Sequence, residues 1–299
     1  MNSIIIGDGG MGSELRYRGI EVPSHTKSIW SALALIEYPQ AIKQIHLDYI
    51  EAGSEYITIN NYSVTRPILQ RVGKADQLED LTLKAIEIAQ DAIKESKKEI
   101  KIAGSLPPLE TSYRADLILN QNAMIDQYKE ISEILKDKVD IIICETMSNI
   151  LETKCALNSV QNSQSQIWTS WTLMGNRENV LPSGENIVDA YKAVSDLRSD
   201  AYLINCCGVN LVTKALSSIR ELTSKPIGAY ANSEIVKIDN QNLDLNKHPE
   251  DDHWLTAEEI DEDRYAEEAS KWVDIGATVI GGCCRTRPSH IKRLKEIFS

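Results

Sequence analysis

The sequence lacks the features of membrane-spanning, nucleic-acid-binding and disulfide-stabilised proteins. None of its apolar runs approaches the roughly 20 residues that a membrane-spanning helix needs. The formal net charge of −12 argues against a nucleic acid or an anionic membrane as a partner. Its 6 Cys are too few for a disulfide scaffold in a chain of 299 residues, so we expect these thiols to be reduced, metal-bound or catalytic.

Two further signals are absent near the N-terminus. Residues 1–6 contain no basic leader and no signal-peptide apolar region, which predicts a cytoplasmic protein. The Gly-rich stretch at residues 7–12 lacks G-x-G-x-x-G spacing, and no P-loop Lys follows it, so we expect no nucleotide site there. The overall composition, with 42% hydrophobic and 25% charged residues, is that of a soluble globular protein.

What the sequence does contain is a regular alternation of short apolar runs and amphipathic stretches. Eight runs read as buried strands, at residues 3–6, 56–59, 101–103, 139–144, 167–172, 202–204, 226–231 and 277–280. Each run is followed by a helical stretch, or by a loop and then a helical stretch. This alternation requires parallel strands joined by helical crossovers, and eight of them predict an α/β fold with a single (β/α)8 TIM barrel.

The predicted barrel occupies the whole chain as one domain, residues 1–299. Its helical stretches include residues 39–52 and 75–97, and we interpret His46, within the first of them, as a structural residue. One segment interrupts the alternation, because residues from about 233 to 263 are acidic, polar and only weakly periodic. A loop of this length in a compact domain is usually a lid or a binding loop, and its acidic run is typical of a solvated face.

Polar and thiol side chains follow the ends of many of these strands. They are Asp8, Asn60, Ser105, Glu145, Cys206, Asn232, Cys283 and Cys284. Because the carboxyl ends of barrel strands converge on one face, where active sites lie, we expect these side chains to share one site. Cys144 lies within a strand and Cys155 within a helix, so both are predicted to serve in packing.

Two of these strand ends carry thiols. Cys206 follows the run 202–204, and Cys283 and Cys284 follow two glycines after the run 277–280. Three thiols from two strands suit zinc, which binds thiolate sulfur and keeps its fourth position open in catalytic sites. The spacing alone leaves other interpretations open, because buried Cys can be packing residues and adjacent Cys can form a vicinal disulfide or do redox work.

Taken together, these motifs resemble those of the homocysteine S-methyltransferases over nearly the whole chain. The markers are Asp8-Gly9-Gly10-Met11-Gly12-Ser13, residues 46–53, Asn60-Asn61-Tyr62, Gly104-Ser105, Glu145-Thr146, Asn205-Cys206 and Gly281-Gly282-Cys283-Cys284. The resemblance implies a (β/α)8 barrel with one zinc ion per chain, bound by Cys206, Cys283 and Cys284. It also implies that Asp8 and Glu145 hold the amino group of homocysteine.

The same motifs supply further expectations. The other substrate-binding residues that the resemblance implies are Gly9, Asn60, Ser105, Thr146 and Asn205.

The sequence departs from the family pattern at Cys207, where a small residue without a thiol is usual, and this extra thiol could compete as a metal ligand. The expected partners are homocysteine and a small methyl donor, with no nucleic acid and no membrane. The sequence leaves open whether the chain is a monomer or a homodimer.

The reaction that the resemblance implies is zinc-dependent methyl transfer to the thiol of L-homocysteine, giving methionine. Zinc coordination deprotonates a thiol whose ordinary pKa is about 8.5 and makes it a nucleophile. Nothing in the sequence after the last barrel helix predicts a folate or cobalamin module, or the C-terminal arm of betaine enzymes. We therefore expect a sulfonium donor, in the first place S-methylmethionine and in the second S-adenosylmethionine. An aromatic side chain such as Trp171 could favour such a cation.

Four alternatives stay open at this point. The barrel could belong to a betaine-type or other thiol methyltransferase. Its thiols could hold a structural zinc ion whose fourth ligand is Cys207 or His290, or they could do redox work. The chain could also bind zinc and homocysteine without catalysis.

Overall fold

The computed structural model describes residues 3–240 and 257–299, and its centre is one eight-stranded parallel sheet. The strands are β1 (Ile5–Ile6), β2 (Tyr56–Thr58), β3 (Lys101–Leu106), β4 (Ile141–Met147), β5 (Gln166–Trp171), β6 (Ala201–Gly208), β7 (Ile227–Asn232) and β10 (Ala277–Gly282). Their order in the sheet is β1-β10-β7-β6-β5-β4-β3-β2, with each neighbouring pair parallel. The predicted (β/α)8 barrel is confirmed.

The first and second strands form the two ends of this sheet, and hydrogen bonds at both tips bring them together. At the N-terminal end of β2, the Glu55 amide donates to the Ile6 carbonyl over 2.7 Å. At the opposite end, the Thr58 amide donates to Asp8 Oδ2, also over 2.7 Å. The sheet therefore curls into a nearly closed barrel, and a side chain of the predicted site forms part of its seam.

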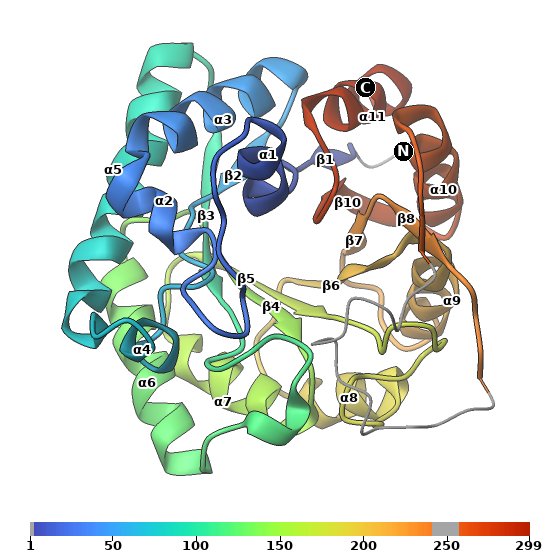
Figure 1. Ribbon diagram of the computed structural model, residues 1–299. Coiled ribbons are helices and arrows are strands. Elements are labelled where there is room, and N and C mark those ends of the chain that lie inside the picture. The colour runs from blue at the N-terminus through green and yellow to red at the C-terminus, as the bar shows by residue number, and fades with distance from the viewer. Residues whose placement is uncertain (1–2, 241–256) are drawn as a thin grey trace.

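Helices surround the strands (Figure 1). They are α1 (Met11–Tyr17), α2 (Ala32–Glu37), α3 (Pro39–Ala52), α4 (Arg66–Gln70), α5 (Leu78–Ser96), α6 (Gln121–Leu135), α7 (Ile150–Val160), α8 (Ile187–Val194), α9 (Val209–Arg220), α10 (Glu262–Asp274) and α11 (Pro288–Phe298). Local sequence sets many of their ends. Pro39 begins α3, Gly53 ends it with a left-handed φ of 111°, and Asn149 caps α7 by accepting from the Glu152 amide.

The structure corrects the predicted start of one helix and confirms the predicted role of His46 in another. The stretch predicted as one helix from residue 75 begins with a 3₁₀ turn, Ala75–Gln77, and becomes α-helical only at Leu78. His46 is fully buried in α3, and neither ring nitrogen has a hydrogen-bond partner. Burial lowers the pKa of His46 to about 4, so the ring is neutral and serves in packing, as predicted.

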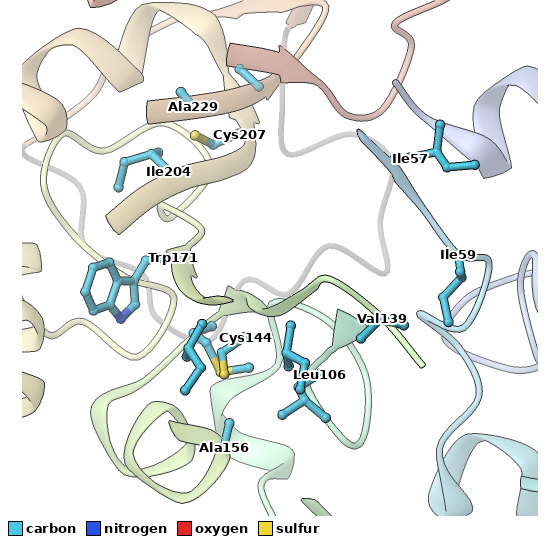
Figure 2. Packing of buried hydrophobic residues seen from close by; sticks show 14 of the residues in the cluster. Ile57, Ile59, Leu106, Val139, Cys144, Ala156, Trp171, Ile204, Cys207 and Ala229 are labelled. Carbon is cyan, nitrogen blue, oxygen red and sulfur yellow. The ribbon is translucent and has the colours of Figure 1, made fainter. Parts of the chain in front are cut away.

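Buried apolar residues form two layers. The larger cluster fills the space between the strands and the helices, and part of it is shown in Figure 2. The smaller cluster fills the barrel itself with Tyr56, Ala103, Ile141, Ile143, Trp168, Ala201, Leu203, Tyr230 and Val279. In β6, Leu203 faces the barrel interior and Ile204 the helices, as the period of two along a strand requires.

The polar segment from about 233 to 263 is not a simple loop in the part that the structure describes. Its ends pair as an antiparallel ribbon of β8 (Glu234–Val236) and β9 (Ala257–Glu259), with Glu234 opposite Glu259. The rest of the segment, residues 241–256, lies outside the described residues. Within the described ranges, every helix is too short or too polar to cross a lipid bilayer.

Candidate active site

Three thiols from two strand ends meet at the carboxyl face of the barrel. The Sγ atoms of Cys206, Cys283 and Cys284 all lie within 4.8 Å of one another, and the Cys206–Cys284 pair is 3.7 Å apart. Two thiolates on a tetrahedral zinc ion are about 3.8 Å apart, because each Zn–S bond is about 2.3 Å. In the metal-free group, hydrogen bonds from Cys206 and Cys283 hold the pKa of Cys284 well below its usual range, whereas hydrogen bonds with Cys206 and Cys284, together with burial, raise the pKa of Cys283. The geometry and chemistry of this donor set fit a zinc ion.

A bulge in β6 decides which of its two Cys joins this group. Strict alternation after Leu203 would turn residue 207 toward the barrel interior. The register with β7 shifts between Asn205 and Gly208, and Cys206 takes a left-handed φ of 55°. As a result Cys206 faces the site, and Cys207 packs in the outer cluster with Ile204 and Ala229 (Figure 2).

The two adjacent Cys are fixed by backbone hydrogen bonds just after β10. The Cys283 amide donates to the Ala231 carbonyl over 2.8 Å, and the Cys284 amide donates to Asn232 Oδ1 over 3.1 Å. The Thr286 hydroxyl donates to the Cys283 carbonyl over 2.6 Å. A Cβ at Gly282 would come within 2.3 Å of Thr286 Oγ1, so this close turn requires glycine.

The two residues proposed to close a structural zinc site do not lie with the three thiols. Cys207 packs in the outer apolar cluster and borders a neighbouring cavity without joining the thiol group, and His290 Nε2 pairs with Ser233 Oγ over 2.9 Å. Within residues 3–240 and 257–299, no fourth Cys, His, Asp or Glu joins the group. A metal held there would therefore have an open position, as in catalytic zinc sites. Cys144 and Cys155 are buried in the core, as predicted.

The thiols border a cavity of about 230 Å³ that also contains most of the predicted substrate-binding residues. The predicted residues that line it are Asp8, Gly9, Asn60, Glu145, Thr146, Cys206, Cys283 and Cys284. We refer to this space as the inner cavity. Ser105 and Asn205 do not line it, although both are fully buried beside it.

Asn205 instead ties two strand tips together. Its Oδ1 accepts from the Thr146 amide over 3.0 Å and from the Ser170 hydroxyl over 2.6 Å, and its Nδ2 donates to Thr146 Oγ1 over 2.8 Å. Thr146 has a left-handed φ of 57°, at a register shift in β4. These bonds join the irregular tip of β4 to that of β6, so they position Glu145 and Cys206 together.

Asp8 is a buried carboxylate at the floor of the inner cavity. Its Oδ2 accepts from the Thr58 amide, and its Oδ1 accepts from the Thr58 hydroxyl over 3.2 Å. Burial raises the pKa of Asp8 to about 7, and the nearby charge of Glu145 acts in the same direction. Without a bound cation, Asp8 is close to half protonated at neutral pH.

Glu145 is the second buried carboxylate. Its Oε2 accepts from the Tyr230 hydroxyl over 3.1 Å, and burial raises its pKa. Two carboxylates that share a buried cavity repel each other, and a cation placed between them relieves both the repulsion and the cost of desolvation. The inner cavity therefore combines a cation-binding end, at Asp8 and Glu145, with a thiol-lined end.

A comparison with known families decides what this arrangement is. A family model described as homocysteine S-methyltransferase matches residues 5–298. The chain belongs to the homocysteine S-methyltransferase family. It is therefore an enzyme of the methyltransferase class, and the resemblance seen in the sequence is confirmed.

Individual relatives agree with this assignment. Homocysteine S-methyltransferase 3 of Arabidopsis thaliana is 27% identical, over 98% of this chain and 89% of the relative. Selenocysteine Se-methyltransferase of Brassica oleracea var. italica is also 27% identical, over 97% of this chain and 87% of the relative. The metallated crystal structure of the Escherichia coli homocysteine methyltransferase MmuM has a TM-score of 0.79 and 27% identity, and the match covers 99% of this chain and 96% of MmuM.

The site of this homocysteine S-methyltransferase family member includes residues that the sequence did not single out. Tyr230 lies in β7 and was read only as part of an apolar run. Tyr113 lies in the loop before α6, and its hydroxyl is 2.8 Å from Cys206 Sγ and 3.0 Å from the Cys206 carbonyl oxygen. Tyr113 could not be predicted as a site residue, because a loop has no periodic pattern that shows which side chains face a cavity. Its left-handed φ of 66° is known only from the structure.

The aromatic residue at the site was also predicted incorrectly. Trp171 is fully buried in the outer layer, where its ring stacks on Tyr202 with 5.9 Å between centroids. Trp30 lines the cavity instead, and the Arg16 guanidinium lies 4.3 Å from the centroid of its ring. The alternation of side chains in β5 turns Trp168 into the barrel and Trp171 away from it, beyond any role with a substrate.

Proposed function

We propose that this enzyme transfers a methyl group from a sulfonium donor to the thiol of L-homocysteine and forms methionine. The observation that carries this proposal is the pairing of three thiols with two buried carboxylates in one cavity. Membership of the homocysteine S-methyltransferase family and the names of the plant relatives support homocysteine as the acceptor. Zinc, the identity of the donor and the product are our inference.

Homocysteine matches the two ends of the inner cavity. Its ammonium group would lie between Asp8 and Glu145, and its thiol would reach the Cys206, Cys283 and Cys284 sulfurs. Thr58 and Tyr230 hold the two carboxylates in place by hydrogen bonds of 2.7 and 3.1 Å. A bound ammonium group lowers the pKa of both carboxylates, because the cation stabilises their ionised form. The two carboxylates would therefore become fully negative only when homocysteine is bound.

The remaining predicted residues have two different roles in this proposal. Gly9, Asn60 and Thr146 line the inner cavity and would contact homocysteine directly. Ser105 and Asn205 would act from behind them, because their backbone and side-chain hydrogen bonds hold the strand tips.

Cys206, Cys283 and Cys284 would hold one zinc ion, which when bound would supply the Lewis acidity that keeps the substrate thiol deprotonated at neutral pH. The protein groups around these sulfurs would keep the site ordered. Tyr113 donates a hydrogen bond toward Cys206, and the turn from Gly282 to Thr286 fixes Cys283. The thiol proton of homocysteine would leave to water.

In the transfer itself, a lone pair of the homocysteine sulfur forms a bond to the methyl carbon of the donor. The bond between that carbon and the sulfonium sulfur breaks, and its electron pair stays on the leaving sulfur, which becomes a neutral thioether. An anionic acceptor and a cationic donor thus give two neutral thioethers. The chain contributes mainly by aligning the two sulfur atoms and the methyl carbon, and by excluding water from the buried inner cavity.

The proposal extends to the setting of the enzyme. One barrel domain over residues 1–299 would carry the reaction, with homocysteine and a small methyl donor as its partners. Its three thiols must stay reduced to bind metal, and this requirement favours a reducing compartment such as the cytoplasm.

A methyl-transfer assay on reduced, zinc-loaded protein tests the proposal. Homocysteine is the acceptor, and S-methylmethionine, S-adenosylmethionine and betaine are offered separately as donors. We expect methionine from a sulfonium donor, and loss of the activity when zinc is chelated and its return when zinc is restored. Turnover with betaine alone would contradict the donor assignment. Activity that persists after complete removal of the metal would contradict the proposed chemistry.

A further inference from the structure

A second and larger cavity lies on the other side of the thiols from Asp8 and Glu145. Its volume is about 540 Å³, and we call it the outer cavity. Six residues line both cavities, namely Ser13, His25, Trp30, Tyr113, Cys206 and Cys284. The two thiols therefore lie where the cavities meet. A donor in the outer cavity could present its methyl group to an acceptor sulfur held in the inner one.

The wall of the outer cavity carries fixed charges of both signs. Glu234, at the start of β8, has a side chain that is only 7% exposed, and its Oε2 lies 3.1 Å from Arg285 Nη1. The Arg285 side chain is 42% exposed. Arg16 lines the same cavity, with its guanidinium over the ring of Trp30. These groups offer a carboxylate and two guanidinium groups to whatever enters.

One residue links this charged wall to the metal site. Asn232 Oδ1 accepts from the Cys284 amide over 3.1 Å, and Asn232 Nδ2 donates to Glu234 Oε1 over 3.1 Å. Asn232 thereby links the buried carboxylate of Glu234 to the backbone that carries Cys284. A donor whose head lies at this wall could point its methyl group toward the thiols that the two cavities share.

We propose that the outer cavity binds the amino-acid head of the methyl donor, with the donor's ammonium group at Glu234 and its carboxylate at Arg285 and Arg16. This inference rests on the proposed function, and it adds a specificity site for the second substrate. The sulfonium group would lie toward Cys206 and Cys284, and the head toward the charged wall. Both ends of a zwitterion would thus meet groups of opposite charge.

The chemistry of the wall selects among donor classes. A donor with a free ammonium group can give Glu234 a charge-assisted hydrogen bond, which is stronger than a neutral one. A quaternary-ammonium donor has no N–H for that carboxylate. A sulfonium compound with a carboxylate but no ammonium group would use the Arg side chains alone. The inference therefore predicts preference for α-amino-acid sulfonium donors over simpler sulfonium compounds.

The test compares two donors and two matched variants of the zinc-loaded protein. The donors are S-methylmethionine and dimethylsulfoniopropionate, which share a dimethylsulfonium group and a carboxylate, but only the first has an ammonium group. Glu234→Gln removes the carboxylate from the outer cavity with little change of shape. Glu259→Gln is the control, because Glu259 pairs with Glu234 across the ribbon but binds Tyr17 outside the cavity.

We expect Glu234→Gln to raise the KM for S-methylmethionine by about 10-fold to 100-fold, the range for loss of a hydrogen bond to a charged group. Its KM for dimethylsulfoniopropionate and for homocysteine should change by less than about threefold. Glu259→Gln should leave all three values unchanged. Glu234→Asp, which keeps the charge on a shorter side chain, should lie between Glu234→Gln and the original protein.

Direct binding separates failure of this inference from failure of the proposed function. S-methylmethionine is titrated by calorimetry, without homocysteine, into each variant in an Asp8→Asn background. No turnover is then needed, and the ammonium site of the inner cavity, which also suits an α-amino acid, is weakened. Weaker binding to Glu234→Gln than to Glu259→Gln supports the donor site, even if the transfer assay shows no product. Equal binding to both variants, or an equal rise in KM for both sulfonium donors, would overturn the inference while leaving the methyl-transfer reaction intact.

Discussion

Asp8 is predicted to bind substrate and also to lower the free energy of unfolding of the protein. The substitution Asp8→Asn measures this loss of stability. Burial raises the pKa of Asp8 from 3.8 to about 7. At a pH between these two pKa values, Asp8 is ionised in the unfolded chain but still protonated in the folded chain. The free energy of unfolding therefore falls as the pH rises from about 4 to about 7. At 1.36 kcal/mol for each pKa unit, the full shift corresponds to about 4 kcal/mol at pH 8.

Asp8→Asn removes this titration while its Oδ1 can still accept from the Thr58 amide. At pH 8 we expect the metal-free variant to be about 2–4 kcal/mol more stable than the original protein, after allowance for a weaker, uncharged hydrogen bond. At pH 4 the difference should vanish, because the original Asp8 is then protonated in the folded state. The same variant should bind homocysteine at least about tenfold more weakly, through loss of one charge at the ammonium site.

Urea unfolding of the reduced, metal-free proteins at pH 4, 6 and 8 provides the measurement. Asp140→Asn is the matched control, since Asp140 Oδ2 also accepts from a strand amide, that of Ile102 over 2.8 Å, but at an exposed position at the other end of the barrel. This control should gain no stability at pH 8. The reasoning would be refuted if Asp8→Asn were less stable than the original protein at pH 8, or if the difference in stability between the two proteins did not vary with pH.

Three further substitutions separate the roles of the other residues. Cys283→Ala should lose zinc retention and activity together, whereas Cys207→Ala should keep both; metal analysis after gel filtration checks this, and equal loss in the two variants would disprove the assignment of ligands. Glu145→Gln should weaken homocysteine binding by about 10-fold to 100-fold with zinc still bound, and loss of zinc would show that this carboxylate serves the metal. Asn205→Ala should cost about 2–4 kcal/mol, because it leaves the buried amide and hydroxyl of Thr146 unpaired. Chemical denaturation measures that loss, and a cost below about 1 kcal/mol would mean that the strand tips do not depend on Asn205.

The sequence by itself determined the barrel and the outline of its site. Eight apolar runs separated by helical stretches leave few topologies other than parallel strands with helical crossovers. In such a barrel, a polar residue directly after a buried strand must lie at the carboxyl face. Asp8, Glu145, Cys206, Cys283 and Cys284 could therefore be assigned to one face from their positions in the chain, before any distance was known.

The tertiary structure alone decided which side chains enter the inner cavity. Alternation along β6 would have turned Cys207 inward, but the bulge at Cys206 reverses the two thiols. That bulge is held by hydrogen bonds between Asn205 and Thr146, 59 residues apart in the chain, which no local pattern records. In the same way Tyr230 reaches Glu145 across the barrel.

The charged wall of the outer cavity has a similar origin. Glu234 follows β7 and Arg285 follows β10, and each looks like an ordinary polar residue in its own stretch of sequence. Their pairing depends on the neighbouring positions of these two strands in the sheet, and on the ribbon that turns Glu234 inward. Sequence periodicity reports which face of an element is buried, whereas contacts between distant elements are set only when the barrel closes.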